Sequence, residues 1–296
     1  MSFSSQTCAQ SLRNSKDEFF MKAFLPNVRL FLHKDSINMS EWNRLSHFNS
    51  PFGFMEYKYE VIPVLKLIPK PKEPLLSPKP GSNGCVRCAV VGTGGILNGS
   101  KMGAEIDAHD YVFRMNGAIT EGYEEDVGKR TSVYVHSAHS IVKSPIHSLF
   151  QGIKYVMMPE KMKDIQWLEG LLKGKRVAAG PFPKSENYSD GFFFIASRFL
   201  SSPKLKTERW PSIRPTNGAF TIFLALHTCD TVDAYGFLTD DFDKYSTYYF
   251  QRDTKINFFF HTNHDFLLER DLWIDLHNRK IIRLYQRNDT EKVEQR

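Results

Sequence analysis

Short apolar runs alternate with longer stretches of helical spacing from residue 86 to residue 286. The runs have the length of buried strands, and they lie at 86–92, 111–116, 131–137, 154–159, 175–180, 231–237 and 281–286. The helical stretches between them lie at 100–110, 164–174, 192–202, 215–229 and 264–277. Strands that alternate with helices in this way predict an α/β fold with a mainly parallel sheet.

The chain before residue 85 has a different composition. A helix is predicted at 40–47, with Ser40 as its N-cap. Residues 63–84 contain six prolines and end in Gly-Ser-Asn-Gly, which predicts an extended strap. We therefore divide the sequence into residues 1–84, an N-terminal segment whose strap packs on the domain, and residues 85–296, the domain itself.

The charge of the chain is modest and dispersed. It has 39 lysines and arginines against 33 aspartates and glutamates, a formal net charge of +6, with no long basic run. That surplus fits a small anionic substrate as well as it fits a nucleic acid. No stretch approaches the ~18 apolar residues of a membrane span, and the first residues lack the apolar region of a signal peptide. Taken literally, these features describe a cytosolic protein.

Other features favour a secretory compartment. The chain contains Asn-x-Ser/Thr triplets at Asn38, Asn98, Asn187 and Asn288. It also contains an even number of cysteines, at Cys8, Cys85, Cys88 and Cys229. These permit two disulfides in any of three pairings. The Cys-x-x-Cys spacing at 85–88 also occurs in zinc and redox sites, but a structural zinc site needs a second close pair.

A glycine cluster follows the first apolar run of the domain, at 92–95. A dinucleotide-binding fingerprint needs a third glycine, and Leu97 stands at that position. The phosphate-binding Gly-Lys-Ser/Thr pattern is also missing. Glycines still allow backbone N–H groups to approach an anion at the start of a helix. The cluster therefore indicates either a nucleotide or phosphate site, or a tight turn with no ligand.

Four segments resemble the sialylmotifs of animal sialyltransferases, in the order in which that family has them. Residues 88–134 resemble the large motif and residues 214–237 the small motif. Residues 245–250 stand where the third motif belongs, and His264 with Glu269 matches the very small motif, His-x4-Glu. The two ends of the chain are similar to the subgroup that sialylates O-linked GalNAc at its 6-hydroxyl.

This resemblance implies a fold and a reaction. The fold is a Rossmann-like, GT-A-variant sialyltransferase domain, with residues 1–84 close to the stem. The reaction is the inverting transfer of sialic acid from CMP-sialic acid to the 6-hydroxyl of GalNAc on serine or threonine of mucin-type glycoproteins, without cofactor, metal ion or nucleic acid. Residues 240–243 contain the Asp-x-Asp pattern that binds metal in other glycosyltransferases, but here we interpret them as a solvated turn.

His264 is the general base that the resemblance implies. It would take the proton of the acceptor hydroxyl as CMP departs. We expect it at the start of a helix, where the dipole disfavours the imidazolium ion. The alternative is a histidine that caps the helix or fills the core. Glu269, five residues on, lies about 140° around the helix and is interpreted as structural.

The resemblance also implies the donor site and the disulfides. Thr216 opens a helix whose N–H groups suit the phosphate and carboxylate of the donor, although the same turn is explained by simple N-capping. The implied disulfides are Cys88–Cys229 and, with it, Cys8–Cys85. The residues expected to bind CMP-sialic acid are Thr93, Gly94, Asn116, Thr216, Asn217, Gly218 and Tyr248.

Two of these positions depart from the family pattern. Thr93 stands where the family usually has asparagine, and Tyr248 where it usually has histidine. Threonine lacks the amide, and tyrosine donates only a neutral hydrogen bond to a departing phosphate. Two alternatives therefore stay open: an inactive relative that binds CMP-sugar or glycan, and a sialyltransferase with another acceptor or linkage.

The resemblance implies a location as well. Family members are type II membrane proteins that face the Golgi lumen. Because this sequence shows no span, we expect membrane attachment only through an anchor that is absent from the chain.

Overall fold

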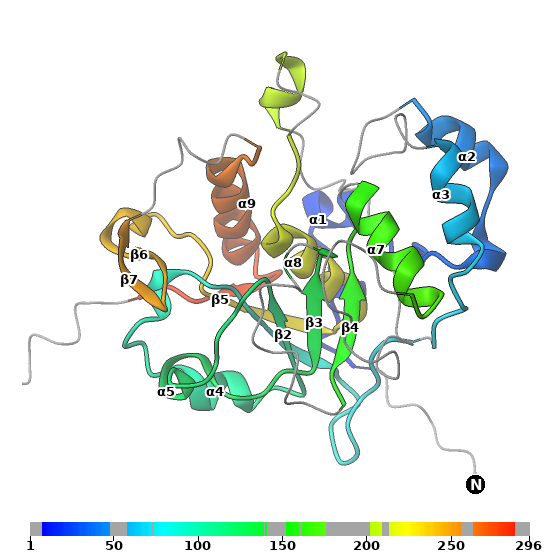
Figure 1. Cartoon of the computed structure of the whole chain (residues 1–296). Helices are drawn as coiled ribbons and strands as arrows, with labels where there is room; N and C mark the ends of the chain where they lie inside the picture. Colours follow the sequence, from blue (N-terminus) through cyan, green and yellow to red (C-terminus); the bar gives the residue numbers. More distant parts are fainter. Residues whose placement is uncertain are drawn as a thin grey trace, which may run out of the picture.

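The computed structural model describes residues 8–47, 58–72, 74–138, 140, 152–159, 162–175, 202–208, 213–255 and 263–287. Over these residues the main sheet has six strands in the order β4-β3-β2-β1-β5-β8, and all neighbours are parallel. The strands are β1 (Arg87–Val91), β2 (Tyr111–Met115), β3 (Val133–His136), β4 (Lys154–Met157), β5 (Thr231–Tyr235) and β8 (Arg283–Leu284). The predicted α/β fold with a parallel sheet flanked by helices is confirmed (Figure 1).

Helices cover both faces of this sheet (Figure 1). Helix α8 (Asn217–Thr228) packs on one face, and nearly all of its side chains are buried. The shorter helices α4 (Gly103–Asp107) and α5 (Glu124–Val127) lie on the other face. Alternation along β1 serves both layers, because Cys88 and Val90 join the cluster around α8 while Ala89 and Val91 join the opposite cluster.

The remaining elements lie around the sheet. Helix α9 (Phe266–Asn278) packs its buried Trp273 against Phe223 of α8, with ring centroids 5.8 Å apart. A small antiparallel hairpin, β6 (Ser246–Tyr248) and β7 (Gln251–Lys255), was not predicted. Four further helices are α1 (Glu18–Ala23), α2 (Met39–Leu45), α3 (Lys58–Leu65) and α7 (Met162–Leu172).

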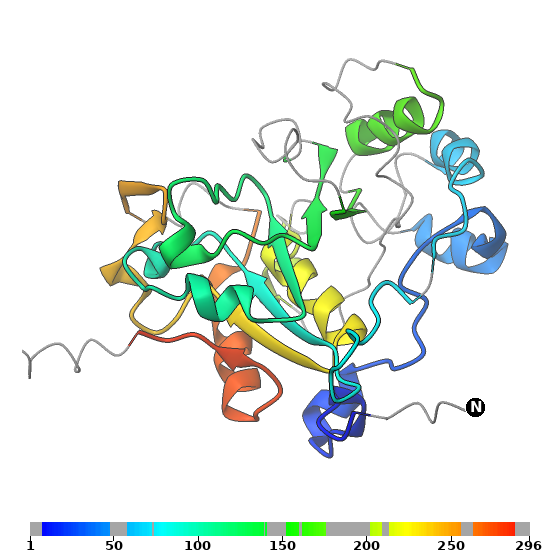
Figure 2. The same ribbon diagram turned by 90° about the horizontal axis from the view of Figure 1, so that it is seen from below.

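The N-terminal segment contributes side chains to the main core. Phe20, Phe24 and Phe31 are buried in the same cluster as α8, together with Leu75 and Leu76 from the strap. Each such side chain contributes roughly 1.5–3 kcal/mol of transfer free energy when fully buried. Figure 2 shows α1 beside the C-terminal end of α8, where the Phe24 and His227 rings lie 4.8 Å apart. The strap and the segment around helix α1 are thus part of the packed core.

Several boundaries differ from the sequence prediction. Helix α2 begins at Met39, and its N-cap is Asn38 rather than Ser40, because the Asn38 side chain accepts from both Ser40 N–H and Glu41 N–H. Helix α3 includes Pro63, so the strap begins after Leu65. The strand predicted at 175–180 and the helix predicted at 192–202 fall almost wholly outside the described residues, as do two of the four glycosylation triplets.

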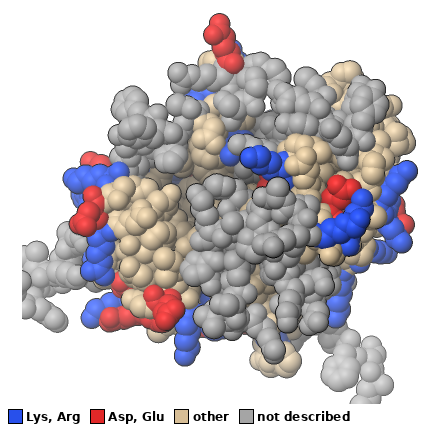
Figure 3. Space-filling view, viewed as in Figure 1, with Lys and Arg blue, Asp and Glu red and all other residues tan. Residues whose placement is uncertain are grey.

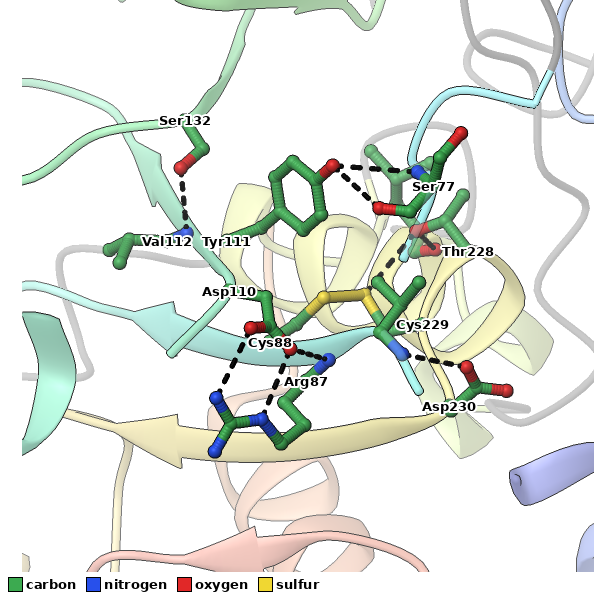
Figure 4. Close-up of a disulfide and its surroundings, with 12 residues drawn as sticks. Ser77, Arg87, Cys88, Asp110, Tyr111, Val112, Ser132, Thr228, Cys229 and Asp230 are labelled. Carbon is green, nitrogen blue, oxygen red and sulfur yellow. Dashed lines mark hydrogen bonds and ion pairs between the residues drawn. A yellow bond between two sulfur atoms is a disulfide. The ribbon is translucent and has the colours of Figure 1, made fainter. Parts of the chain in front are cut away.

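Two disulfides tie the chain together, and both are the pairs that the resemblance implied. Cys88–Cys229 joins β1 to the C-terminal end of α8, and Cys8–Cys85 joins the N-terminal segment to the end of the strap. Around the first of these, Arg87 pairs with Asp110, as Figure 4 shows. A zinc or redox role for Cys85 and Cys88 is excluded by these bonds.

Candidate functional site

The candidate site lies where the strand order reverses. From β1 the chain reaches β2 on one side and, later, β5 on the other. In open parallel sheets, a crevice lies at the carboxyl ends of the strands where the order reverses in this way, which here is around β1. The turns after β1 and β2 and the N-terminus of α8 meet at this edge. Of the motif residues singled out in the sequence, Asn116 and Asn217 are in contact at this edge, and Gly94 lies against Gly236 in the turn after β5.

The glycine cluster holds another backbone segment. Gly92 N–H donates to Tyr235 O at 2.7 Å, and Gly94 N–H donates to Gly236 O at 3.0 Å. A Cβ on Gly94 would lie 2.6 Å from Gly236 O, so a side chain there is excluded. Gly236 itself has φ +72°, a left-handed conformation that glycine adopts without strain. Both N–H groups are thus used in backbone hydrogen bonds and do not bind an anion. The tight-turn interpretation accounts for Gly92 and Gly94.

Asn116 ends β2 and contacts the start of α8. It has φ +55°, a left-handed conformation that asparagine tolerates better than most residues. Its Oδ1 accepts from Asn217 Nδ2 at 2.6 Å, and its backbone oxygen accepts from the Tyr134 hydroxyl. This bond joins two predicted donor-binding residues that are 101 positions apart in the sequence. The pair presents amide groups, which recognise both donors and acceptors.

Thr216 is the N-cap of α8, which begins at Asn217. Its Oγ1 accepts from Ala219 N–H at 3.0 Å. Its own N–H and hydroxyl donate to the two carboxylate oxygens of Glu269, at 2.7 and 2.6 Å. Gly218 follows, where a Cβ would lie 3.0 Å from the Phe237 ring. The first turn of α8 is thus fixed from α9 and from the turn after β5.

Glu269 is the residue whose contact with the site the sequence did not show. Its side chain is 5% exposed, and burial raises its pKa to about 7, against the lowering effect of the two bonds from Thr216. Its structural role was predicted, but its partner was not, because 53 residues separate it from Thr216. It links the very small motif to the small motif.

His264 lies at the edge of the site in the turn before α9. The helix begins at Phe266 with Asp265 as N-cap, so His264 precedes its start by two residues. The half-buried ring has Nδ1 2.9 Å from Arg214 O and Nε2 3.1 Å from Asn263 Nδ2. A carbonyl oxygen only accepts, so Nδ1 carries the proton and Nε2 is the acceptor. In this tautomer Nε2 is the basic nitrogen, and in the structure it accepts from Asn263 Nδ2.

The third-motif hairpin borders the glycine turn. Tyr249 N–H donates to Thr93 O at 3.0 Å, which attaches the hairpin to the turn after β1. The neighbouring Tyr248 is half-buried, and its ring stacks on Phe250 with centroids 5.2 Å apart. Thr93 and Tyr248, the two residues that depart from the family pattern, therefore lie on one connected piece of structure.

The acidic stretch at 240–243 is a turn. Asp241 accepts from the hydroxyls of Thr239 and Tyr245, at 2.7 and 2.8 Å, and these bonds lower its pKa against the opposing effect of burial. Within the described part of the chain, no group of three or more His, Cys, Asp or Glu side chains is placed to hold a metal ion. On the face in Figure 3, basic and acidic side chains of the described residues are interspersed.

Comparisons with known proteins agree with this architecture. The family model for glycosyltransferase family 29 (sialyltransferase) matches residues 31–281. The chain is 40% identical to "Alpha-N-acetylgalactosaminide alpha-2,6-sialyltransferase 1" of Gallus gallus, over 95% of the chain and 56% of that protein. It is 38% identical to "Alpha-N-acetylgalactosaminide alpha-2,6-sialyltransferase 2" of Mus musculus, over 94% of the chain and 82% of that protein.

A solved structure extends the likeness to the fold. "Crystal Structure of a Mammalian Sialyltransferase" has a TM-score of 0.66 and 26% identity, and the match covers 95% of this chain and 99% of that one. The chain spans about half the length of the Gallus gallus relative. Among the described residues, no helix has the length and apolar character needed to cross a bilayer. The family match and the 40% identity together show that this chain belongs to the sialyltransferases of glycosyltransferase family 29.

Proposed function

We propose that this protein transfers sialic acid from CMP-sialic acid to the 6-hydroxyl of GalNAc linked to serine or threonine of mucin-type glycoproteins. The geometry of His264 is the observation that carries the proposal, because its Nδ1 faces Arg214 O at the edge of the site and Nε2 is then the nitrogen that can accept a proton. The GalNAc α-2,6 linkage follows the names of the relatives that are about 40% identical. No metal ion or cofactor takes part in the proposed reaction.

The proposed mechanism is a single inverting displacement. Nε2 of His264 takes the proton from the acceptor 6-hydroxyl, whose oxygen attacks the anomeric carbon of the sialic acid. The bond from that carbon to the phosphate oxygen breaks, and CMP leaves with the electron pair. The base lowers the barrier because the hydroxyl becomes a strong nucleophile only as its proton departs.

The donor would lie across the carboxyl ends of β1 and β2. Asn116 and Asn217 offer amide groups to CMP, and the first turn of α8 offers N–H groups to its anionic parts. Thr93, Gly94, Gly218 and Tyr248 complete the proposed donor site. We also propose that the protein acts in the Golgi lumen, since its two disulfides suit an oxidising compartment, and that residues 85–296 are its catalytic domain.

The first test measures transfer to glycopeptides that carry either bare GalNAc or Gal-GalNAc, with product mass and linkage as the readout. Wild type should add one sialic acid at the 6-hydroxyl, and His264→Ala should lower kcat by about 10²–10⁴-fold. The exposed His47 provides the matched control, and His47→Ala should transfer at the wild-type rate. Transfer with another linkage would show that the proposed acceptor position is wrong. A wild-type rate in His264→Ala would show that His264 is not the general base.

An inactive glycan- or CMP-binding relative is the second candidate. The departures at Thr93 and Tyr248 favour it, and the attachment of the hairpin to the glycine turn connects the two positions. The double variant Thr93→Asn/Tyr248→His tests this candidate. If the protein is inactive, the double variant should gain transfer at least tenfold while its affinity for CMP stays similar. If wild type is active, the rate should change by less than about threefold.

A further inference from the structure

The segment that carries His264 is held in place from two sides. On one side, Arg214 N–H donates to Asn263 O at 3.0 Å, and Arg214 O lies 2.9 Å from His264 Nδ1. This side belongs to the residues just before α8. The Arg214 contact sets the ring tautomer. A different element contacts the other side of the 263–265 turn.

The other side is held by η6 (Pro203–Lys206), a short 3-10 helix with Ser202 as its N-cap. The Ser202 hydroxyl donates to Asp265 Oδ2 at 2.5 Å. The Lys204 ammonium donates to His264 O at 3.1 Å and lies 3.6 Å from Asp265 Oδ1. One lysine thus contacts the backbone of the base and the carboxylate next to it.

A pocket separates these two supports. Its empty space is about 330 Å³, and its lining includes Leu205 from η6, Ile213 and Pro215 from the segment before α8, and Leu268 from α9. The Lys204 contact therefore lies on the η6 side of this pocket, and the Arg214 contact reaches the same turn from the segment before α8. Lys204 itself is nearly half exposed, so its removal should not unfold the protein.

We propose that Lys204 is a positioning residue for His264, which fixes the backbone of the base and keeps the imidazole neutral by placing a positive charge beside it. This inference rests on the proposed function for its kinetic consequences. Among the described residues, the charged side chains on the elements that contact this turn are Lys204 of η6, Arg214 of the segment before α8, and Asp265 and Glu269 at the start of α9. Without Lys204, Asp265 loses its nearest cation, and a protonated His264 becomes more favourable.

The test compares Lys204→Met with Lys204→Arg and with Lys206→Met, which removes an exposed lysine from the same 3-10 helix. In Lys204→Met, the acid limb of the pH profile of kcat/KM should move to higher pH by about half a unit. Its kcat should fall several-fold, while the acceptor KM stays within about twofold. Lys204→Arg keeps the positive charge and should retain the wild-type acid limb and kcat. Lys206→Met should match wild type in both.

A second readout does not depend on activity. The protonation midpoint of His264 can be followed by NMR in histidine-labelled protein, with the signal assigned from His264→Gln. A higher midpoint in Lys204→Met than in Lys206→Met supports the inference. Equal midpoints, or an unchanged acid limb in an active enzyme, overturn it. If wild type transfers nothing, the proposed function fails, and the NMR comparison still decides whether Lys204 controls His264.

Discussion

Glu269 places a carboxyl group in the core to hold the first turn of the helix that opens the site. It is almost fully buried, and it accepts hydrogen bonds from the N–H and the hydroxyl of Thr216. Burial of a carboxylate favours its protonated form, and two hydrogen bonds only partly offset that effect. The pKa of about 7 therefore makes this residue a source of pH dependence near neutrality.

The stability of the protein should fall as pH rises through this range. The folded protein binds the Glu269 proton with a pKa of about 7, whereas the unfolded chain binds it near 4.5. The free energy of unfolding then decreases between about pH 4.5 and 7, by about 3 kcal/mol at most. Glu269→Gln does not titrate, so the melting temperature of wild type relative to this variant should fall as pH is raised across the window.

The control for this experiment is on the same helix. Asp271 is exposed, and Asp271→Asn should leave the pH dependence of the melting temperature as it is in wild type. If Glu269→Gln follows the wild-type curve in parallel over the whole range, the carboxyl is not the group that titrates.

The sequence predicted which residues belong to the candidate site better than it predicted the contacts between them. The sequence identified Asn116, Thr216 and His264, because each stands in a motif at a strand end or a helix start. It did not predict that Asn116 contacts Asn217, or that Gly94 donates its N–H to Gly236. Such contacts depend on the distance between strands in the folded sheet, which no local pattern encodes.

At the scale of elements, the two disulfides have similar expected contributions to stability but different positions. Their sequence separations are 77 and 141 residues, for which the chain-entropy model gives about 4.5 and 5 kcal/mol. Stability alone therefore distinguishes them poorly. Cys88–Cys229 joins the start of β1 to the C-terminal end of α8, the helix whose N-terminus opens the site, whereas Cys8–Cys85 attaches the N-terminal segment.

Removing each disulfide should loosen different elements. In Cys8→Ser/Cys85→Ser, hydrogen exchange should increase over residues 8–24 and the strap, while α8 stays protected and CMP still binds. In Cys88→Ser/Cys229→Ser, exchange should increase in α8, and CMP affinity should fall with it. Increased exchange in α8 in both variants to the same extent would contradict this division.

The elements themselves were predicted unevenly, for physical reasons. Apolar runs such as 86–92 predicted strands at the places where the structure has them, because burial on both faces leaves a clear signal. The β6–β7 hairpin was missed because β7 is exposed along its whole length and shows no apolar alternation. The start of α2 was misplaced by two residues, since Asn38 and Ser40 are both common N-caps and only the fold decides between them.

At the scale of the whole molecule, the N-terminal segment belongs to the core of the domain. Phe20 and Phe24 from α1 pack in the same cluster as Leu76 of the strap and the helix α8. The sequence predicted a strap that packs on the domain, but its prolines could not show which side chains reach the core. The division at residue 84 stays a prediction about chain organisation, since the packing crosses it.

The fold class was predictable because alternation of strands and helices determines the sheet, and a parallel sheet places all carboxyl ends at one edge. The general location of the site follows from that rule. The supports of His264 were not predictable, because Ser202 and Lys204 lie in a stretch without a motif and meet the turn only in the folded chain.

The pairing of cysteines has a consequence for the order of events during synthesis. Cys8, Cys85 and Cys88 are all synthesised before Cys229, which follows Cys88 by 141 residues. At that stage Cys8 meets two candidate partners that are three positions apart, and only one of them is correct. Cys88 has to wait as a free thiol until α8 is complete. Efficient production therefore depends on a thiol–disulfide exchange catalyst that can undo a premature Cys8–Cys88 bond.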